Sequence, residues 1–128
     1  MKSIGHAELA DYPSASRLEW IEANGVGGLA ASSVVGANTR KQHAVLSIDN
    51  EYGGRTVLVA SLQESILYEG RTYDLSTNAY FGAISPKSYE HLESFSADPW
   101  PTWRYRFHDI VIEKTLCLIY GENTVIVR

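Results

Sequence analysis

The chain has 128 residues, of which 45% are hydrophobic and 20% charged, so it can form one soluble globular domain or part of one. Its net charge of -4 offers no electrostatic basis for binding nucleic acid. No apolar run approaches the length of a membrane span, and residues 1–6 lack the apolar core of a signal peptide. The single cysteine, Cys117, excludes an internal disulfide, and we predict a cytoplasmic protein.

The chain in order begins with a polar arm, residues 1–16, which we expect to be flexible and loosely held. From residue 17 onward, short apolar and β-branched runs alternate with turn signals, and no segment has a helical period over a dozen residues. Strands are predicted at 17–22, 29–35, 42–48, 56–67, 72–75, 91–96, 102–107, 110–120 and 124–128. The pattern favours an all-β fold, a mostly antiparallel β-sandwich that occupies residues 17–128.

Residues 19–46 hold the densest set of turn signals. Three glycines in four positions follow Asn24, and glycine adopts positive φ at little steric cost. The spacing differs from that of a dinucleotide-binding loop and no helix pattern follows, so turn geometry is favoured over phosphate binding. A second turn precedes a polar row that begins the next strand. The structural positions that we assign here are Asn24, Gly25, Gly27, Gly28 and Gly36.

Glu64 is the one charged residue on the apolar face of the predicted strand 56–67. An isolated buried carboxylate is costly, so Glu64 must be paired, hydrogen-bonded or placed at an opening. Arg40 is a suitable partner, because its guanidinium matches a carboxylate. We assign Glu64 a structural role. Glycoside hydrolysis commonly needs two carboxyl groups that flank the scissile bond, and the sequence shows no convincing pair, so no catalytic residue is assigned.

Candidate binding residues fall into three groups, each with a structural alternative. Arg40 and His43 either touch a ligand or form strand-end structure. Trp100 and Trp103 either stack on sugar rings or pack in the core or an interface. The third group, Asn78 and Tyr80, lies in a predicted loop, where a turn role competes with binding. We interpret His6, His91 and His108 as scattered surface residues and Cys117 as a small packed hydrophobe, and we expect no metal and no cofactor.

Several segments, in order, resemble the N-terminal domain of the bacterial and archaeal type of glycogen debranching enzyme, the amylo-α-1,6-glucosidase family. The likeness covers residues 17–128. At residues 40–44 the family usually has Arg-Arg-Tyr-His-Gly, and this chain differs there. The segments are Glu19-Trp20, Asn24-Gly25-Val26-Gly27-Gly28, Gly36-Ala37-Asn38-Thr39-Arg40-Lys41-Gln42-His43, Leu75-Ser76-Thr77-Asn78-Ala79-Tyr80, residues 95–103, Glu113-Lys114 and Tyr120-Gly121-Glu122-Asn123-Thr124-Val125.

The resemblance implies a supersandwich-like domain that precedes a helical (α/α)₆ barrel, which holds the catalytic carboxylates. The barrel hydrolyses α-1,6-glucosidic branch points of a glycogen-like glucan. This chain, whether truncated or not, would shape the cleft and brace the barrel, and we expect it to be inactive alone. The residues expected to face substrate or barrel are Asn38, Thr39, Arg40, His43, Asn78, Tyr80, Trp100 and Trp103.

Two alternatives remain open at this point. The chain is either part of such an enzyme or a free-standing β-sandwich that serves as a carbohydrate-binding or assembly module. Because residues 125–127 form an apolar β-like run with no turn after it, we also expect a homo-oligomer that pairs strands or packs sheets near the C-terminal strands. The competing outcome is a monomer in which the arm, residues 1–16, folds over the exposed edge.

Overall fold

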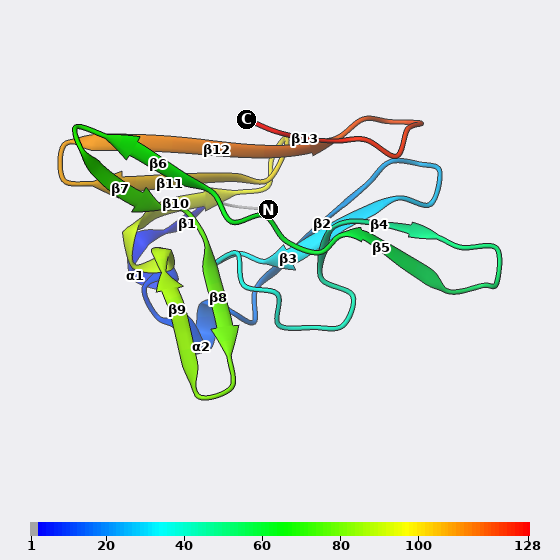
Figure 1. Cartoon of the computed structure of the whole chain (residues 1–128), viewed down its shortest axis with the longest axis horizontal. Coiled ribbons are helices and arrows are strands. Elements are labelled where there is room, and N and C mark those ends of the chain that lie inside the picture. The colour runs from blue at the N-terminus through cyan, green and yellow to red at the C-terminus, as the bar shows by residue number, and fades with distance from the viewer. Residues whose placement is uncertain (1–2) are drawn as a thin grey trace.

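The computed structural model describes residues 3–128 and is built mainly from strands (Figure 1). Three short helices are described: α1 (His6–Leu9), α2 (Tyr12–Ala15) and the 3₁₀ helix η1 (Ser88–His91). The strands in the first half are β1 (Ile4–Gly5), β2 (Glu19–Ala23), β3 (Leu29–Ser33), β4 (Ala44–Asp49) and β5 (Arg55–Val59). Those in the second half are β6 (Ser65–Tyr68), β7 (Arg71–Asp74), β8 (Thr77–Tyr80), β9 (Ala83–Lys87), β10 (Leu92–Ser96), β11 (Thr102–Phe107), β12 (Ile110–Leu118) and β13 (Val125–Val127).

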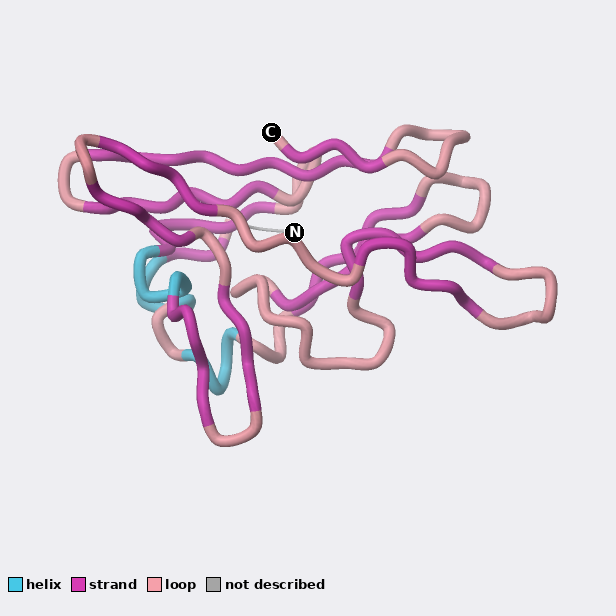
Figure 2. Tube along the Cα trace, viewed as in Figure 1, coloured by secondary structure: helices cyan, strands magenta, loops and turns pink. Residues whose placement is uncertain are grey.

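The strands form two larger sheets and two separate hairpins. One sheet has the order β1-β10-β11-β12-β13, the other β2-β3-β4-β5, and the hairpins are β6-β7 and β8-β9. Neighbouring strands are antiparallel in each of these pairings. The predicted all-β, mostly antiparallel fold is therefore confirmed. Figure 2 shows how strands make up most of the trace, with the helical turns confined to one region.

The two larger sheets meet through aromatic side chains. In β11, alternate residues point inward, and Trp103, Tyr105 and Phe107 are buried while the arginines between them are exposed. The Trp103 ring stacks edge-on against Trp20 of β2, with 5.5 Å between centroids. Phe95 of β10 lies 5.3 Å from Trp103 on the same sheet. This cluster forms the centre of the shared hydrophobic core.

Two buried hydrogen bonds fix the aromatic residues of β11. The Trp103 indole N–H donates to the carbonyl oxygen of Val34 at 2.9 Å, and the Tyr105 hydroxyl donates to the carbonyl oxygen of Leu75 at 2.9 Å. A buried polar group with a partner avoids the desolvation penalty of an unpaired one. The five-stranded sheet is thus joined to the chain that follows β3 and to the segment that precedes β8.

The predicted strand 56–67 is wrong, because the structure divides it. β5 ends at Val59, the chain continues as a loop, and β6 begins at Ser65 in a different hairpin. Alternating apolar residues continue across the break, and no glycine or proline marks it, so the sequence pattern could not locate it. Figure 2 shows this connection as a loop that runs between the sheets. Glu64 lies in it.

Other departures concern short elements. Residues 78–80, predicted as a loop, belong to β8, which pairs with β9. The helices contain four residues each, which is too short to produce a helical period in the sequence. Among residues 3–128, the helices fall short of the length and apolar character needed to cross a bilayer.

The N-terminal arm contacts the five-stranded sheet within its described part. Ile4 pairs with Phe95, so β1 covers the outer edge of β10. The Leu9 and Ala15 side chains are fully buried. The edge covered by the arm is that of β10, at the opposite end of the sheet from β13. The expected looseness of residues 1–16 stays a prediction, and residues 1–2 lie outside the described chain.

Candidate functional site

Asn24 closes the turn between β2 and β3 with its own side chain. Its Oδ1 accepts hydrogen bonds from the backbone N–H groups of Val26 at 3.0 Å and Gly28 at 2.8 Å. The Asn24 backbone N–H donates to the Gly28 carbonyl at 3.1 Å. Asparagine suits this position because its amide imitates a backbone turn. The side chain is fully buried, so water does not compete for these hydrogen bonds.

The same side chain connects this turn to the one between β12 and β13. Asn24 Nδ2 donates to the Glu122 carbonyl at 2.6 Å and to Asn123 Oδ1 at 2.8 Å, and the Gly121 N–H donates to the Asn24 carbonyl at 2.7 Å. These two turns lie side by side in Figure 1 at the ends of the two larger sheets. Asn24 therefore fixes one sheet relative to the other at this end.

The glycines of the turn have distinct roles. Gly25 and Gly27 have φ of 81° and 89°, which favour glycine. Gly28 has no room for a side chain, since a Cβ atom would collide with the Asn24 amide and lie 2.8 Å from Asn123 Oδ1. Gly36 has φ of 88° with open space around it, so backbone conformation alone favours glycine there.

A second cluster, the His43 clasp, consists of Glu19, Arg40 and His43. The His43 ring accepts at Nδ1 from the backbone N–H groups of Thr39 at 2.9 Å and Arg40 at 3.2 Å. Its proton is therefore on Nε2, which donates to Glu19 Oε1 at 2.9 Å. Arg40 Nε lies 2.8 Å from the same oxygen. The partner expected for Arg40 was Glu64, and that pairing is wrong.

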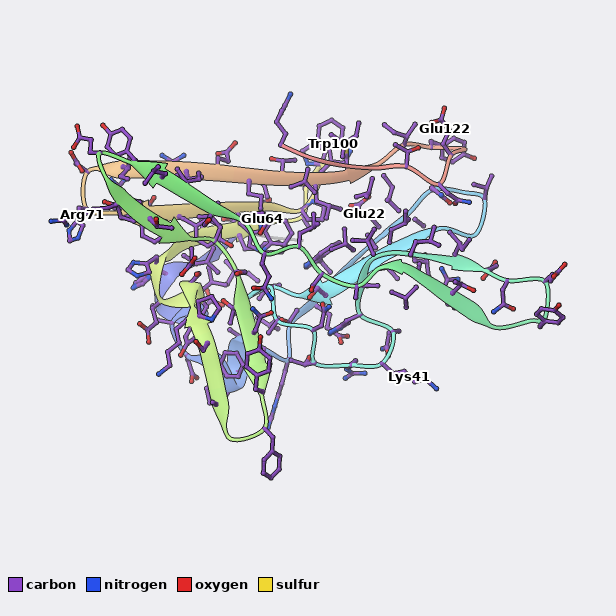
Figure 3. The ribbon with its side chains drawn as sticks, viewed as in Figure 1. Glu22, Lys41, Glu64, Arg71, Trp100 and Glu122 are labelled. Atoms are coloured by element: carbon purple, nitrogen blue, oxygen red, sulfur yellow. The ribbon has the colours of Figure 1, made fainter. Side chains whose placement is uncertain are left out.

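The clasp gives the 38–42 loop a fixed shape while leaving the long polar side chains of the loop exposed. The His43 side chain is 1% exposed, whereas that of Arg40 is 61% exposed. Figure 3 shows Lys41 at the tip of this loop, directed away from the sheets. A buried imidazole thus orders the loop from within, and the loop presents exposed hydrogen-bond donors next to β2.

Between the two larger sheets lies a cavity of about 50 Å³, here called the inter-sheet cavity. Its lining includes five residues that the sequence analysis singled out, together with Trp20 and Lys114. A cavity of this size accommodates several water molecules. The five residues are Gly36, Asn38, Glu64, Asn78 and Trp103.

Lys114 is the charged partner of Glu64 in this cavity. Its Nζ lies 3.4 Å from Glu64 Oε2 and 4.9 Å from the centroid of the Trp103 ring. Burial lowers the pKa of Lys114, and the Glu64 carboxylate opposes that shift. Within residues 3–128, the buried Trp20 Nε1 and Asn78 Nδ2 atoms have no hydrogen-bond partner. The Glu64–Lys114 pair therefore places charged groups in a mostly apolar cavity wall, where they can bind hydroxyl groups or water.

The lining of this cavity limits its chemistry. Glu64 is the one carboxylate among the described lining residues, and it is engaged by Lys114. A second carboxylate across a bound substrate would be needed for the usual glycosidase mechanisms. No group of three His, Cys, Asp or Glu residues within 3–128 has the geometry to hold a metal ion. The arrangement can bind polar groups, and it lacks an acid–base pair.

Two predicted binding residues, Tyr80 and Trp100, lie away from both this cavity and the His43 clasp. Tyr80 is 59% exposed on the β8–β9 hairpin, and Trp100 is 45% exposed in the loop before β11 (Figure 3). Trp103, in contrast, is buried in the core. Asn38 and Thr39 belong to the loop that the clasp orders, and Asn38 Nδ2 donates to the Ala60 carbonyl at 2.8 Å.

Sequence reasoning missed Lys114 and the role of Glu19. Lys114 stands on the inward face of β12, where Ile110, Ile112 and Leu116 alternate with it, and a lysine in such an apolar row was a usable signal. Glu19 was recognised only as part of a Glu-Trp pair. Its partner lies 24 positions away, and no local pattern specifies that contact.

Comparison with known proteins identifies the family. A family model described as "Glycogen debranching enzyme N terminal" matches residues 18–128, nearly the whole chain. No curated protein and no solved structure gives a significant match. The matched region contains the Asn24 turn, the His43 clasp and the inter-sheet cavity. The chain belongs to the family of N-terminal domains of glycogen debranching enzymes.

Proposed function

We propose that this domain shapes the glucan cleft of a debranching enzyme and braces the (α/α)₆ barrel that hydrolyses α-1,6-glucosidic branch points. The observation that carries the proposal is the His43 clasp. A buried imidazole orders the backbone of the 38–42 loop, and the loop contributes little to the hydrophobic core. A loop ordered in this way and exposed at its tip is suited to a contact with another surface.

The surface next to the loop supports the same role. Ile21 of β2 is 65% exposed beside Ala31 of β3, with which it is paired. The Glu19, Gln42 and His43 side chains border these two residues. Apolar area rimmed by polar groups is typical of a contact surface between domains. The arginine and lysine of the loop add donors for glucan hydroxyls or barrel carboxylates.

The test uses a debranching enzyme that carries this domain, with Arg40→Ala as the variant. Arg40 is exposed, so loss of its ion pair should cost about 1 kcal/mol of stability or less. Loss of the Arg40 donor to the barrel or the glucan should lower kcat/KM for a branched dextrin roughly ten-fold or more. Arg71→Ala is the matched control, because Arg71 is exposed at the distant start of β7 (Figure 3).

The result has two clear readings. A fall in kcat/KM for Arg40→Ala, with a melting temperature close to that of Arg71→Ala, supports a role at the cleft or barrel. Equal debranching rates for both variants at normal stability would contradict it.

A further inference from the structure

A groove at the opposite end of the five-stranded sheet from the Asn24 turn has the features of a saccharide site. It forms where β7, β9, η1 and the end of β11 meet, and its volume is about 530 Å³. This is within the range of small-molecule sites in proteins. We propose that this groove, the Tyr73–His91 groove, binds a segment of a glucan chain. The choice of glucan as ligand rests on the proposed function.

Three rings form the groove floor. The Phe107 ring lies 5.0 Å from Tyr73 and 4.6 Å from His91, measured between centroids. Phe107 is buried, Tyr73 is half-buried and His91 is exposed. The buried ring thus holds two accessible rings in place, and flat rings of this kind can stack on the apolar faces of pyranoses. Large rigid side chains also lose little conformational entropy on binding.

The walls of the groove are held by hydrogen bonds. The Ser88 hydroxyl donates to the Asp74 carbonyl at 2.7 Å, which joins η1 to β7. The Tyr89 N–H donates to Thr77 Oγ1 at 3.1 Å, which joins η1 to β8. Both η1 residues are buried. The groove is therefore formed before any ligand arrives, and a preformed site avoids the entropic cost of ordering loops.

The rim offers exposed polar groups of both charges. Asp74, Glu90, Lys87 and His108 are exposed around the rings. Within residues 3–128, Asp74, Glu90 and Lys87 form no salt bridge. Carboxylates accept hydrogen bonds from sugar hydroxyls, and an ammonium group donates to them. Two carboxylates against one ammonium disfavour an anionic ligand, and the mixture of acceptors and donors suits a polyhydroxylated one.

The groove and the inter-sheet cavity have no lining residue in common. The 38–42 loop is also separate from the groove lining. A glycogen-like glucan presents many chain segments, so a second contact on the same particle raises the overall affinity without any change in the cleft. The groove would then retain the enzyme on its polymeric substrate.

The test is a titration of the ¹⁵N-labelled chain with maltoheptaose, followed by amide chemical-shift changes. The expected shifts concentrate at residues 72–74, 86–91 and 107–108. Glu90→Gln replaces a charged acceptor with a weaker neutral one, and His91→Ala removes a stacking ring, so each should weaken binding roughly five-fold or more. Tyr52→Ala is the control: its exposed ring lies in the β4–β5 turn, outside the groove lining, and the variant should leave the affinity unchanged.

The Glu90→Gln variant is nearly isosteric and exposed, and its own spectrum reports whether it is folded. Shifts centred on Trp100 or on the 38–42 loop would overturn the proposal. The absence of shifts with maltoheptaose at millimolar concentration and about ten-fold excess over the chain would also overturn it. This binding result is independent of the debranching rate of Arg40→Ala. Failure of one therefore remains distinguishable from failure of the other.

Discussion

Asn24 provides the sharpest test of how the two sheets are joined, because the chain contains its own control. Asn50 closes the β4–β5 turn with the same local pattern: its Oδ1 accepts from the N–H groups of Tyr52 at 2.9 Å and Gly54 at 3.1 Å. The Asn50 N–H also donates to the Gly54 carbonyl at 2.9 Å. The two asparagines differ in what Nδ2 contacts.

The difference in Nδ2 contacts determines how much stability each asparagine-to-alanine substitution should cost. Asn24→Ala removes two bonds within the turn and two to the β12–β13 turn, at a fully buried position. With about 1 kcal/mol for each bond and a further penalty for buried groups left unpaired, the cost is about 3–5 kcal/mol. Asn50 lies in an exposed turn where water replaces the lost bonds, so Asn50→Ala should cost about 1 kcal/mol.

The assay is urea unfolding of the three proteins, followed by circular dichroism. The free energy of unfolding is extrapolated to water with a common slope. For a domain with about 5–15 kcal/mol of stability, the Asn24→Ala loss is a large fraction of the total. Asn24→Asp adds a second comparison, since aspartate keeps the two acceptor bonds and loses both donor bonds. The loss of unfolding free energy in Asn24→Asp should equal most of the difference between the losses in Asn24→Ala and Asn50→Ala.

Equal losses for Asn24→Ala and Asn50→Ala would refute this reasoning. The result would mean that the bonds from Nδ2 to Glu122 and Asn123 add nothing to the local turn. A small loss for Asn24→Asp, with a large one for Asn24→Ala, would assign the energy to the turn alone.

Three further predictions concern charge, activity and assembly. Burial lowers the pKa of Lys114, so between that lowered pKa and 10.5 the unfolded chain binds more protons than the folded chain. The free energy of unfolding therefore rises with pH in this range. Lys114→Met should remove that part of the pH dependence in unfolding experiments at pH 8–10.5. The isolated chain should release no glucose from branched dextrin, and release that one Asp or Glu substitution abolishes would contradict this. We propose self-association near β13, so sedimentation equilibrium should show a mass that grows with concentration, whereas a constant monomer mass would reject it.

The sequence predicts strands and turns correctly where strand alternation and turn chemistry agree. Residues 102–107 were predicted with the bounds that β11 has in the structure, because buried aromatics alternate there with exposed arginines. The glycine turn after Asn24 was also recognised from local signals. Its connection to residues 121–123 was not, since nothing local links positions that lie almost 100 residues apart.

The errors have the same physical origin. Alternation carried the prediction through residues 60–64, where the chain leaves one sheet and enters a hairpin, and this misplaced Glu64 and its partner. For the histidines interpreted as scattered, separation in sequence was taken as separation in space. His6, His91 and His108 are distant in sequence, yet together they border a single depression beside η1. Long-range pairing of β10 with β1 and β11 brings them together.

A photo-cross-link tests whether the 38–42 loop faces the catalytic barrel. A benzophenone side chain is placed at Lys41, the loop tip in Figure 3, in a debranching enzyme that carries this domain. Tyr52, exposed in the β4–β5 turn, is the control position. Position 41 should cross-link to peptides of the helical barrel within the same chain, and position 52 should not. Cross-links from position 52 alone, or none from position 41 to the barrel, would show that the loop does not face the barrel.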